Sequence, residues 1–392
     1  MRKLALLLGS LVVVASASAK EVVPAPVVVE EAPVQIVEKE VIVYRDKEEG
    51  FRPNGYVDLQ YRWYGDTEGQ NFDNGKDTEG KVGDAWNTAN NYSRLQLQGK
   101  INMTENQALE YRVRNWRELD KEDNKLDKED NKDVRDTAHG AQTRLRYFYN
   151  HGNLGDSKVN YTSRVHYQNT DNHDDDNQNI EYQARFNFAE YMFNNDFVKT
   201  TDFTVAPKYA YSWSDNSSNY DNQLGVDLYS YYELPLGFSA ELNVYTTQHF
   251  YGQDQYFDAA SKKEDKNFTV DVEAYIYNTT NLYTNGNVSV DFNFEGGYDA
   301  YKWSQEKKFG TKRLADKVAT GYPVDGEGTG TLNSKYSVYA LPTVQLNYQA
   351  TPNVKLYVAA GAEYRNWAIE SEKSASNWRW QPTVFAGFRT TF

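Results

Sequence analysis

The feature that most constrains this chain is its final segment, residues 377–392, which reads NWRWQPTVFAGFRTTF. Alternate positions form one mainly apolar and aromatic set: Trp378, Trp380, Pro382, Val384, Ala386, Phe388, Thr390 and Phe392. The positions between them include Arg379, Gln381, Thr383, Gly387 and Arg389. A period of two indicates a β-strand. Its length suits a strand tilted across a bilayer, where about ten residues cover the hydrocarbon.

The amino-terminus has the three parts of a secretory signal peptide. Arg2 and Lys3 precede an apolar stretch that is too short to span a membrane, and Ala17-Ser18-Ala19 follows as a small-residue cleavage site. We therefore predict a cleaved signal peptide over residues 1–19. A short buried helix is the alternative.

Charge and cysteine content narrow the classes of protein further. Without Arg2 and Lys3 the mature chain has about 40 basic against 56 acidic residues, which argues against a nucleic-acid partner. The chain contains no cysteine, so an exported fold must be stabilised by hydrogen bonding and burial rather than by disulfides.

Residues 20–53 differ in composition from the rest of the chain. Pro24, Pro26 and Pro33 lie among valines and glutamates, which predicts an extended periplasmic linker. An added strand or an amphipathic patch is the alternative for this segment.

Alternation predicts about fourteen strands from Asn54 onward, with sixteen as the alternative count. The expected ranges are 54–64, 92–103, 107–117, 141–150, 158–168, 179–190, 200–213, 222–234, 238–249, 267–278, 287–301, 334–348, 354–368 and 377–392.

The expected connections alternate in length along the chain. Long polar segments follow the odd-numbered strands: 65–91, 118–140, 169–178, 214–221, 250–266, 302–333 and 369–376. Short turns, such as Pro235-Leu236-Gly237, follow the even-numbered ones. Short periplasmic turns and long outward loops are typical of outer-membrane barrels. The sequence thus predicts an all-β fold, a transmembrane antiparallel up-and-down β-barrel over residues 54–392.

Aromatic residues near the strand ends favour this barrel over a soluble β-sandwich or propeller. Examples are Tyr61 with Trp63, and Trp378 with Trp380. Aromatic girdles at the two lipid interfaces account for such positions, whereas a two-layer soluble fold does not require them.

One expected outward loop contains a tandem repeat in which LDKEDNK at residues 119–125 recurs at 126–132. Each copy has a single leucine, so the apolar seam of a coiled coil is missing. A solvated loop is the simple interpretation, and a surface that meets host or bacterial ligands is the alternative.

If the apolar phase of each strand faces lipid, the other phase faces the barrel interior. The second to sixth strands then contribute a basic wall: Arg94, Lys100, Arg112, Arg114, Arg144, Arg146, Arg164 and Arg185. The eighth to eleventh contribute an acidic wall: Asp227, Glu233, Glu241, Asp271, Glu273, Asp291 and Glu295. Consecutive strands of a meander are neighbours, so we expect the two walls to face each other.

Opposed walls create a transverse field that favours polar solutes without a deep binding site. We therefore expect a water-filled pore for small hydrophilic solutes and ions. A barrel filled by arginine–glutamate pairs is the alternative, but fourteen strands leave room for water. By length, 65–91 and 302–333 are the candidates for an infolded constriction loop.

Catalytic motifs are not evident. The five histidines do not form a zinc spacing, and glycine-rich phosphate loops and serine elbows are missing. The acidic run at 171–177 departs from a calcium loop because Asp176 stands where glycine is needed. We expect no enzyme activity, no metal site and no cofactor.

Several stretches resemble fusobacterial major outer-membrane porins of the FomA type: the leader MRKLALLLGSLVVVASASAKEV, the prolines of VVPAPVVVEEAP, VIVYRD at 41–46 and RPNGYVDLQYRWYG at 52–65. The similarity is strong over the first 65 residues. It implies a non-specific, voltage-responsive channel, usually a homotrimer, whose loops can also serve adhesion. It transfers no pore residue.

The final segment also resembles the closing strand of Gram-negative barrels, which end in Phe. We therefore interpret Phe392 as an assembly signal for the barrel-assembly machinery. The leading hypothesis is passive diffusion through an outer-membrane porin. Its alternatives are an adhesin anchored by the barrel, motivated by the charged loops, and an outer-membrane hydrolase, for which no nucleophile and base can be assembled.

Overall fold

The structure is a computed structural model that describes residues 50–68, 91–119, 140–172, 175–215, 217–257, 262–309, 330–331, 338–367 and 377–392. The chain divides into two units, Met1–Arg52 and Pro53–Phe392. The expected signal peptide, nearly all of the linker and residues 120–132 of the repeat region lie outside the described residues.

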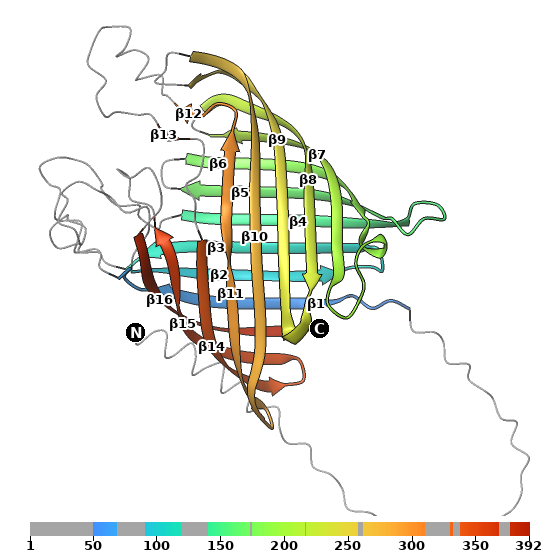
Figure 1. Cartoon of the computed structure of the whole chain (residues 1–392), viewed down its shortest axis with the longest axis vertical. Helices are drawn as coiled ribbons and strands as arrows, with labels where there is room; N and C mark the ends of the chain where they lie inside the picture. The colour runs from blue at the N-terminus through green and yellow to red at the C-terminus, as the bar shows by residue number, and fades with distance from the viewer. Residues whose placement is uncertain are drawn as a thin grey trace, which may run out of the picture. The chain divides into compact units, whose positions relative to one another are not determined.

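The second unit consists of fourteen long strands (Figure 1). Their bounds are β1 Asn54–Tyr64, β2 Tyr92–Asn102, β3 Gln107–Glu118, β4 Gly140–Asn153, β5 Asn160–Asn172, β6 Asp175–Asn187, β7 Lys199–Ser214, β8 Ser217–Glu233, β9 Phe238–Phe257, β10 Lys262–Asn285, β11 Val288–Ser304, β14 Val338–Thr351, β15 Val354–Trp367 and β16 Asn377–Thr391. Two further strands are two residues long, β12 Lys308–Phe309 and β13 Gly330–Thr331.

These long strands form one closed antiparallel ring. Each pairs with its neighbour along the chain, β11 pairs with β14 across the connection that holds the two short strands, and β16 returns to pair with β1. Among the described residues, β12 joins the ring through β9, at Phe309↔Phe257. The predicted all-β, fourteen-strand up-and-down barrel is thus confirmed. A closed ring leaves no unpaired strand edge, which is what a bilayer requires of a β-structure.

Backbone hydrogen bonds complete the closure at the end of the chain. The amide of Gly55 donates to the carbonyl oxygen of Phe392 at 3.1 Å, and the amide of Phe392 donates back at 3.2 Å. The register continues through Leu59↔Phe388 to Tyr64↔Thr383. The final segment, 377–392, is a strand, as its alternation predicted, and it closes the barrel on the first strand.

Alternation along each strand separates two faces. On one of them every long strand presents a large apolar or aromatic side chain to the outside. These are Tyr61, Leu95, Val113, Leu145, Val165, Ile180, Tyr209, Leu224, Leu242, Ile276, Trp303, Val344, Val358 and Val384, each at least 38% exposed. A continuous exposed apolar surface around a closed barrel matches the lipid-facing band of a membrane barrel.

Aromatic clusters border this outer face at both strand ends. Tyr364 contacts Trp378 and Trp380 with ring centroids 5.2 and 4.7 Å apart, at the end where the long connections lie. At the end with short turns, His151 stacks on Tyr161 at 4.4 Å. These positions agree with the expected aromatic girdles.

Several expected strand boundaries were too short. β5 and β6 pair as far as Asn172↔Asp175, β7 and β8 as far as Ser214↔Ser217, and β9 and β10 as far as Phe257↔Lys262. The expected connections 169–178, 214–221 and 250–266 are therefore mainly strand. Alternation fails as a signal here because both faces of these extensions carry polar residues, while the backbone ladder continues.

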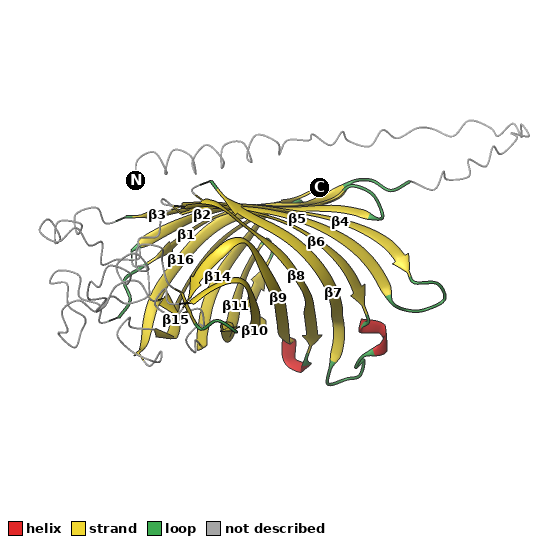
Figure 2. Ribbon diagram, turned by 90° about the horizontal axis from the view of Figure 1, so that it is seen from above, coloured by secondary structure: helices red, strands yellow, loops and turns green. Residues whose placement is uncertain are grey.

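The short turns also differ in detail from the expectation. The β6–β7 connection spans 188–198 and contains the 3-10 turn η2, Ala189–Tyr191. The expected Pro235-Leu236-Gly237 turn is present as η3, Pro235–Gly237, with positive φ at Leu236 and Gly237. Figure 2 shows η2 and η3 at the same end of the strands. No helix in the described part of the chain is long and apolar enough to cross a membrane.

Candidate functional site: the inner face of the barrel

The second face of the sheet is concave, because side chains of non-neighbouring strands meet on it. The Arg164 guanidinium on β5 donates to the Tyr229 hydroxyl on β8 at 3.4 Å. The Gln183 amide on β6 donates to the same hydroxyl at 3.0 Å. Strands two or three positions apart in a closed sheet can share such contacts only on its inner side.

All eight residues of the expected basic wall lie on this inner face. In the register, Gln98 pairs with Arg112 and Arg112 with Arg144. In the next inward row, two residues further along each strand, Lys100 lies opposite Glu110 and Glu110 lies opposite Arg146. Arg94, Arg114, Arg164 and Arg185 lie in the same phase of their strands. The expected basic residues therefore occupy adjacent positions of five neighbouring strands, β2–β6.

The two ends of the basic wall differ in their partners. Arg164 pairs with Glu181 at 2.6 Å and is 5% exposed. Arg185 lies over the Tyr229 ring, with its guanidinium carbon 4.2 Å from the ring centroid. Arg112 and Arg114 instead contact the amide oxygens of Gln142 and Gln96, at 2.8 and 2.6 Å. Amide partners leave the positive charge of these two residues uncompensated.

The expected acidic residues lie in the inward phase of β8–β11, and most of their contacts are neutral donors. The hydroxyls of Tyr245, Tyr277 and Tyr339 donate to Glu273, Glu241 and Glu295, at 3.0, 3.0 and 2.5 Å. Asn347 donates to Asp291 at 2.6 Å. Asp271 pairs with Lys302 in the register. The tyrosine hydroxyls hold their three carboxylates in place as neutral hydrogen-bond donors.

Asp227 and Glu233 form ion pairs with lysines. Asp227 is 1% exposed and pairs with Lys208 at 2.8 Å. Glu233 lies at the end of β8 beside the turn, where it pairs with Lys199 at 2.9 Å and both side chains are about half exposed. Glu233 therefore borders the turn instead of lying within the central rows of the inner face.

The ring separates the basic and acidic sets. β7 lies between them on one side, and β14, β15, β16 and β1 lie between them on the other. The two sets thus occupy different sectors of one enclosed face.

Sequence reasoning missed several charged residues of the same face. Arg62 on β1 lies directly opposite Arg94 and therefore extends the basic sector by one strand. Its alternation with Tyr61 and Trp63 was a signal that could have identified it. Glu181 and Glu110 are carboxylates inside the basic sector, and only the cross-strand register shows which cations they meet.

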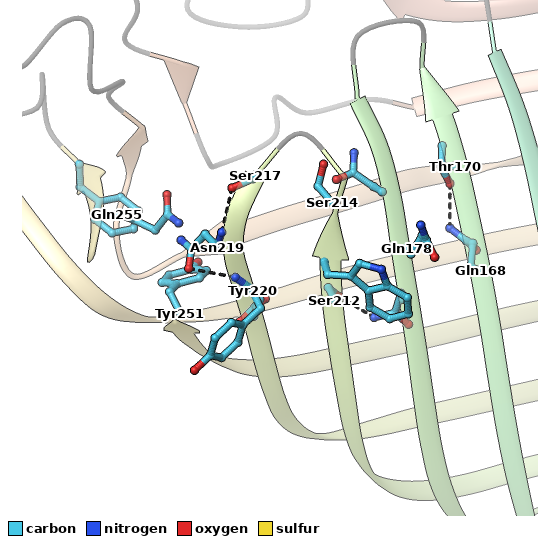
Figure 3. A pocket seen from close by; sticks show the side chains of 15 residues that line it. Gln168, Thr170, Gln178, Ser212, Ser214, Ser217, Asn219, Tyr220, Tyr251 and Gln255 are labelled. Carbon is cyan, nitrogen blue, oxygen red and sulfur yellow. Dashed lines mark hydrogen bonds between the residues drawn. The ribbon is translucent and has the colours of Figure 1, made fainter. Parts of the chain in front are cut away.

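A cavity of about 530 Å³ lies along the inner face of β5–β9, near the ends of these strands (Figure 3). Amide and hydroxyl side chains line much of it, including Gln168, Thr170, Asn179, Ser212 and Asn219. The amide of Asn179 donates to the Ser212 hydroxyl at 2.7 Å. Asp221, which lies 2.7 Å from His249, is the charged residue of this lining, and the rest of it consists of neutral side chains.

Residues that could hold a metal do not cluster in the described ranges: no group of three or more histidine, cysteine or carboxylate side chains is placed to bind one. Positions 173–174 of the acidic run and most of the candidate constriction loops, 69–90 and 310–329, lie outside those ranges.

Among the comparisons with known proteins, only solved structures match this chain. No protein-family model matches the chain. No curated protein matches it either. The DcaP outer-membrane channel of Acinetobacter baumannii aligns at 9% identity over 87% of this chain and 96% of its own, with a TM-score of 0.32. The anion-selective porin from Comamonas acidovorans aligns at 9% identity over 87% and 99%, with a TM-score of 0.29. Salmonella typhi OmpF in complex with daunomycin aligns at 11% identity over 87% and 97%, with a TM-score of 0.30.

The location of the protein follows from its own fold. A closed antiparallel barrel with an apolar outer face and aromatic borders pairs the backbone of each long strand on both sides while exposing apolar side chains. This combination suits lipid and occurs in outer-membrane proteins. The protein is an outer-membrane β-barrel.

Proposed function

We propose that this protein is a porin through which small hydrophilic solutes and ions diffuse passively. The observation that carries the proposal is the polar inner face of a fourteen-strand ring. Charged, amide and hydroxyl side chains dominate this face, and the charged ones are divided into a basic and an acidic sector. A ring of this size has room for a water-filled interior.

In the proposed mechanism, the basic and acidic sectors act on solutes through the electrostatic field between them. Arg112 and Arg144 on one side and Glu241 and Glu273 on the other attract solutes weakly and from opposite directions. Weak attraction at several positions lets a polar solute enter and leave, whereas an apolar solute gains nothing for losing its contacts with water. The proposal contains no chemical step and no cofactor.

The proposal also includes partners in the assembly of the barrel. We include a homotrimer in the membrane and recognition of the last strand by the barrel-assembly machinery. The adhesin alternative depends on the connection at 118–140, most of which lies outside the described residues.

The test is electrical. Purified, refolded protein is added to planar bilayers in KCl, and folding is verified by the heat-dependent gel mobility of barrels. We expect discrete conductance steps. A folded barrel that inserts without producing steps would refute the porin function.

A further inference from the structure

Six arginines form a continuous cluster on the inner face of β1–β4, here called the arginine ladder: Arg62, Arg94, Arg112, Arg114, Arg144 and Arg146. Arg62 lies directly opposite Arg94, and Arg112 lies directly opposite Arg144. Side chains at such positions start about 5 Å apart, and like charges there repel each other. The ladder therefore concentrates positive charge at a cost in folding free energy.

The partners of the ladder orient its guanidinium groups without neutralising them. Arg112 and Arg114 are held by the side-chain amides of Gln142 and Gln96. Arg62 lies over the Phe385 ring, 4.4 Å from its centroid. In the described part of the chain, no carboxylate lies within ion-pair distance, 4.0 Å, of any of the six guanidinium groups.

Unused hydrogen-bonding capacity accompanies this charge. The Nε atoms of Arg62, Arg94, Arg112 and Arg146 are buried and have no hydrogen-bond partner among the described residues. A guanidinium group presents its donors as a fork that matches two oxygens of a phosphate or a carboxylate. The ladder thus combines net charge with donors of suitable geometry.

Other cations on the same face show that the chain can neutralise them. Arg164 pairs with Glu181 at 2.6 Å, Lys208 pairs with Asp227 at 2.8 Å, and Lys100 lies 3.8 Å from Glu110. The ladder differs from these pairs because, in the described part of the chain, none of its guanidinium groups makes an ion pair, although Glu110 lies opposite Arg146 in the register. Its missing counter-charge is what an anionic ligand would supply.

The extent of the ladder indicates the size of that ligand. From the Arg62–Arg94 pair to Arg146 the register advances by three rows, each two residues along a strand. At about 3.3 Å per residue this is roughly 20 Å. A monovalent anion would meet one or two guanidinium groups, whereas a solute with several linked charges would meet most of them.

We propose that the arginine ladder is a binding site for small multivalent oxyanions of the oligophosphate class, placed along the diffusion path of the proposed porin. The site rests on that proposed function for its role in passage, but not for binding itself. Bridging oxyanion groups relieve the repulsion between paired arginines. Such a solute is held long enough to slow the flow of smaller ions.

Inorganic tripolyphosphate is the probe, with acetate as a monovalent comparison. Each is titrated into single-channel recordings in KCl at low ionic strength, where charge contacts are least screened. We expect tripolyphosphate to reduce the conductance of the unmodified protein in a saturable way, and acetate to have little effect. Raised KCl concentration should weaken the block.

The deciding variant is R112Q/R144Q, which removes one directly opposed pair. Its matched control is R117Q/K158Q, which removes the same charge from two exposed residues, one near the end of β3 and one in the β4–β5 turn. We expect the half-blocking concentration to rise about tenfold or more in R112Q/R144Q, since charge-assisted contacts are lost. The control should stay within about twofold.

Equal half-blocking concentrations in the two variants, or equal block by acetate and tripolyphosphate, would overturn the site while leaving the porin function intact. If the folded protein does not conduct, the porin function fails, and calorimetric titration of tripolyphosphate into refolded protein in a neutral detergent decides the site alone. Binding that is lost in R112Q/R144Q and kept in R117Q/K158Q supports the ladder. No detectable binding to the unmodified protein refutes it.

Discussion

At the scale of single residues, Phe392 contributes both its backbone and its side chain to the closing strand. Its backbone pairs with Gly55 at the closing seam, and its side chain is 54% exposed on the outer face. The alternation of the last strand was enough to predict this outward direction. The hydrogen bonds to Gly55 could not be predicted in this way, because they depend on the register between two ends of the chain.

Deletion of Phe392 should reduce insertion into the outer membrane more than it changes the conductance of the molecules that do insert. The deletion removes both the aromatic side chain and the last pair of seam hydrogen bonds, while the inner face keeps its charges. Insertion is measured as the folded, heat-modifiable fraction in outer membranes, and conductance is measured in bilayers.

Two controls separate the contributions of side chain and backbone. F392A keeps the seam pairing and removes only the ring, and T390A changes a neighbour on the same outer face. Normal insertion of the deletion variant would contradict the interpretation of Phe392 as an assembly signal.

At the scale of elements, Tyr357 ties β15 to β1 across the closing strand. Its hydroxyl donates to Asp58 at 2.7 Å and accepts from the Gln60 amide at 3.4 Å. Gly387 on β16 makes this reach feasible, because a Cβ atom there would lie 2.6 Å from the Tyr357 hydroxyl oxygen. The tyrosine therefore reinforces the seam that the last strand closes.

Tyr357→Phe should lower the free energy of unfolding by about 1–3 kcal/mol, because a part-buried hydrogen bond to a carboxylate is lost. Urea unfolding from lipid vesicles measures the change, with Tyr61→Phe on the outer face as the matched control. We also expect Gly387→Ala to be destabilising, since it displaces the same ring. Unfolding of Tyr357→Phe at the same urea concentration as the unmodified protein would argue against the tie.

Strand boundaries show where sequence reasoning is strong at this scale. All fourteen long strands were predicted, and β1 was predicted at its observed bounds, because one of its faces meets lipid and the other meets polar surroundings. β9 and β10 extend well beyond the predicted 238–249 and 267–278. Their extensions have polar residues on both faces, so side-chain alternation does not mark their ends. The pairing of the backbones sets their length.

At the scale of the whole molecule, the separation of charge into two sectors of one ring determines which ions should pass. The quadruple variant R112Q/R114Q/R144Q/R146Q leaves the acidic sector as the main source of the field. We expect its reversal potential in a KCl gradient to shift toward cation preference. R117Q/K158Q, which changes exposed residues elsewhere, should shift it little.

An unchanged reversal potential in the quadruple variant would contradict a role for the basic sector in the conduction path. The complementary variant E241Q/E273Q should move the reversal potential in the opposite direction. Both comparisons are made on protein whose folding has been verified by heat-dependent gel mobility.

The sequence by itself determined the class of fold and predicted about fourteen strands and an inward phase for each expected wall residue, since a period of two is a local property of a strand between lipid and water. Closure of the ring in the structure decided between fourteen strands and sixteen. The tertiary structure decided the partners. Tyr357 and Asp58 are 299 residues apart in sequence. That Arg112 meets Gln142 while Arg164 meets Glu181 depends on the register between strands, which alternation within one strand does not specify. The arginine ladder is therefore recognised only in the closed barrel, because the cross-strand neighbours of its six arginines show that they form no ion pairs in the described part of the chain.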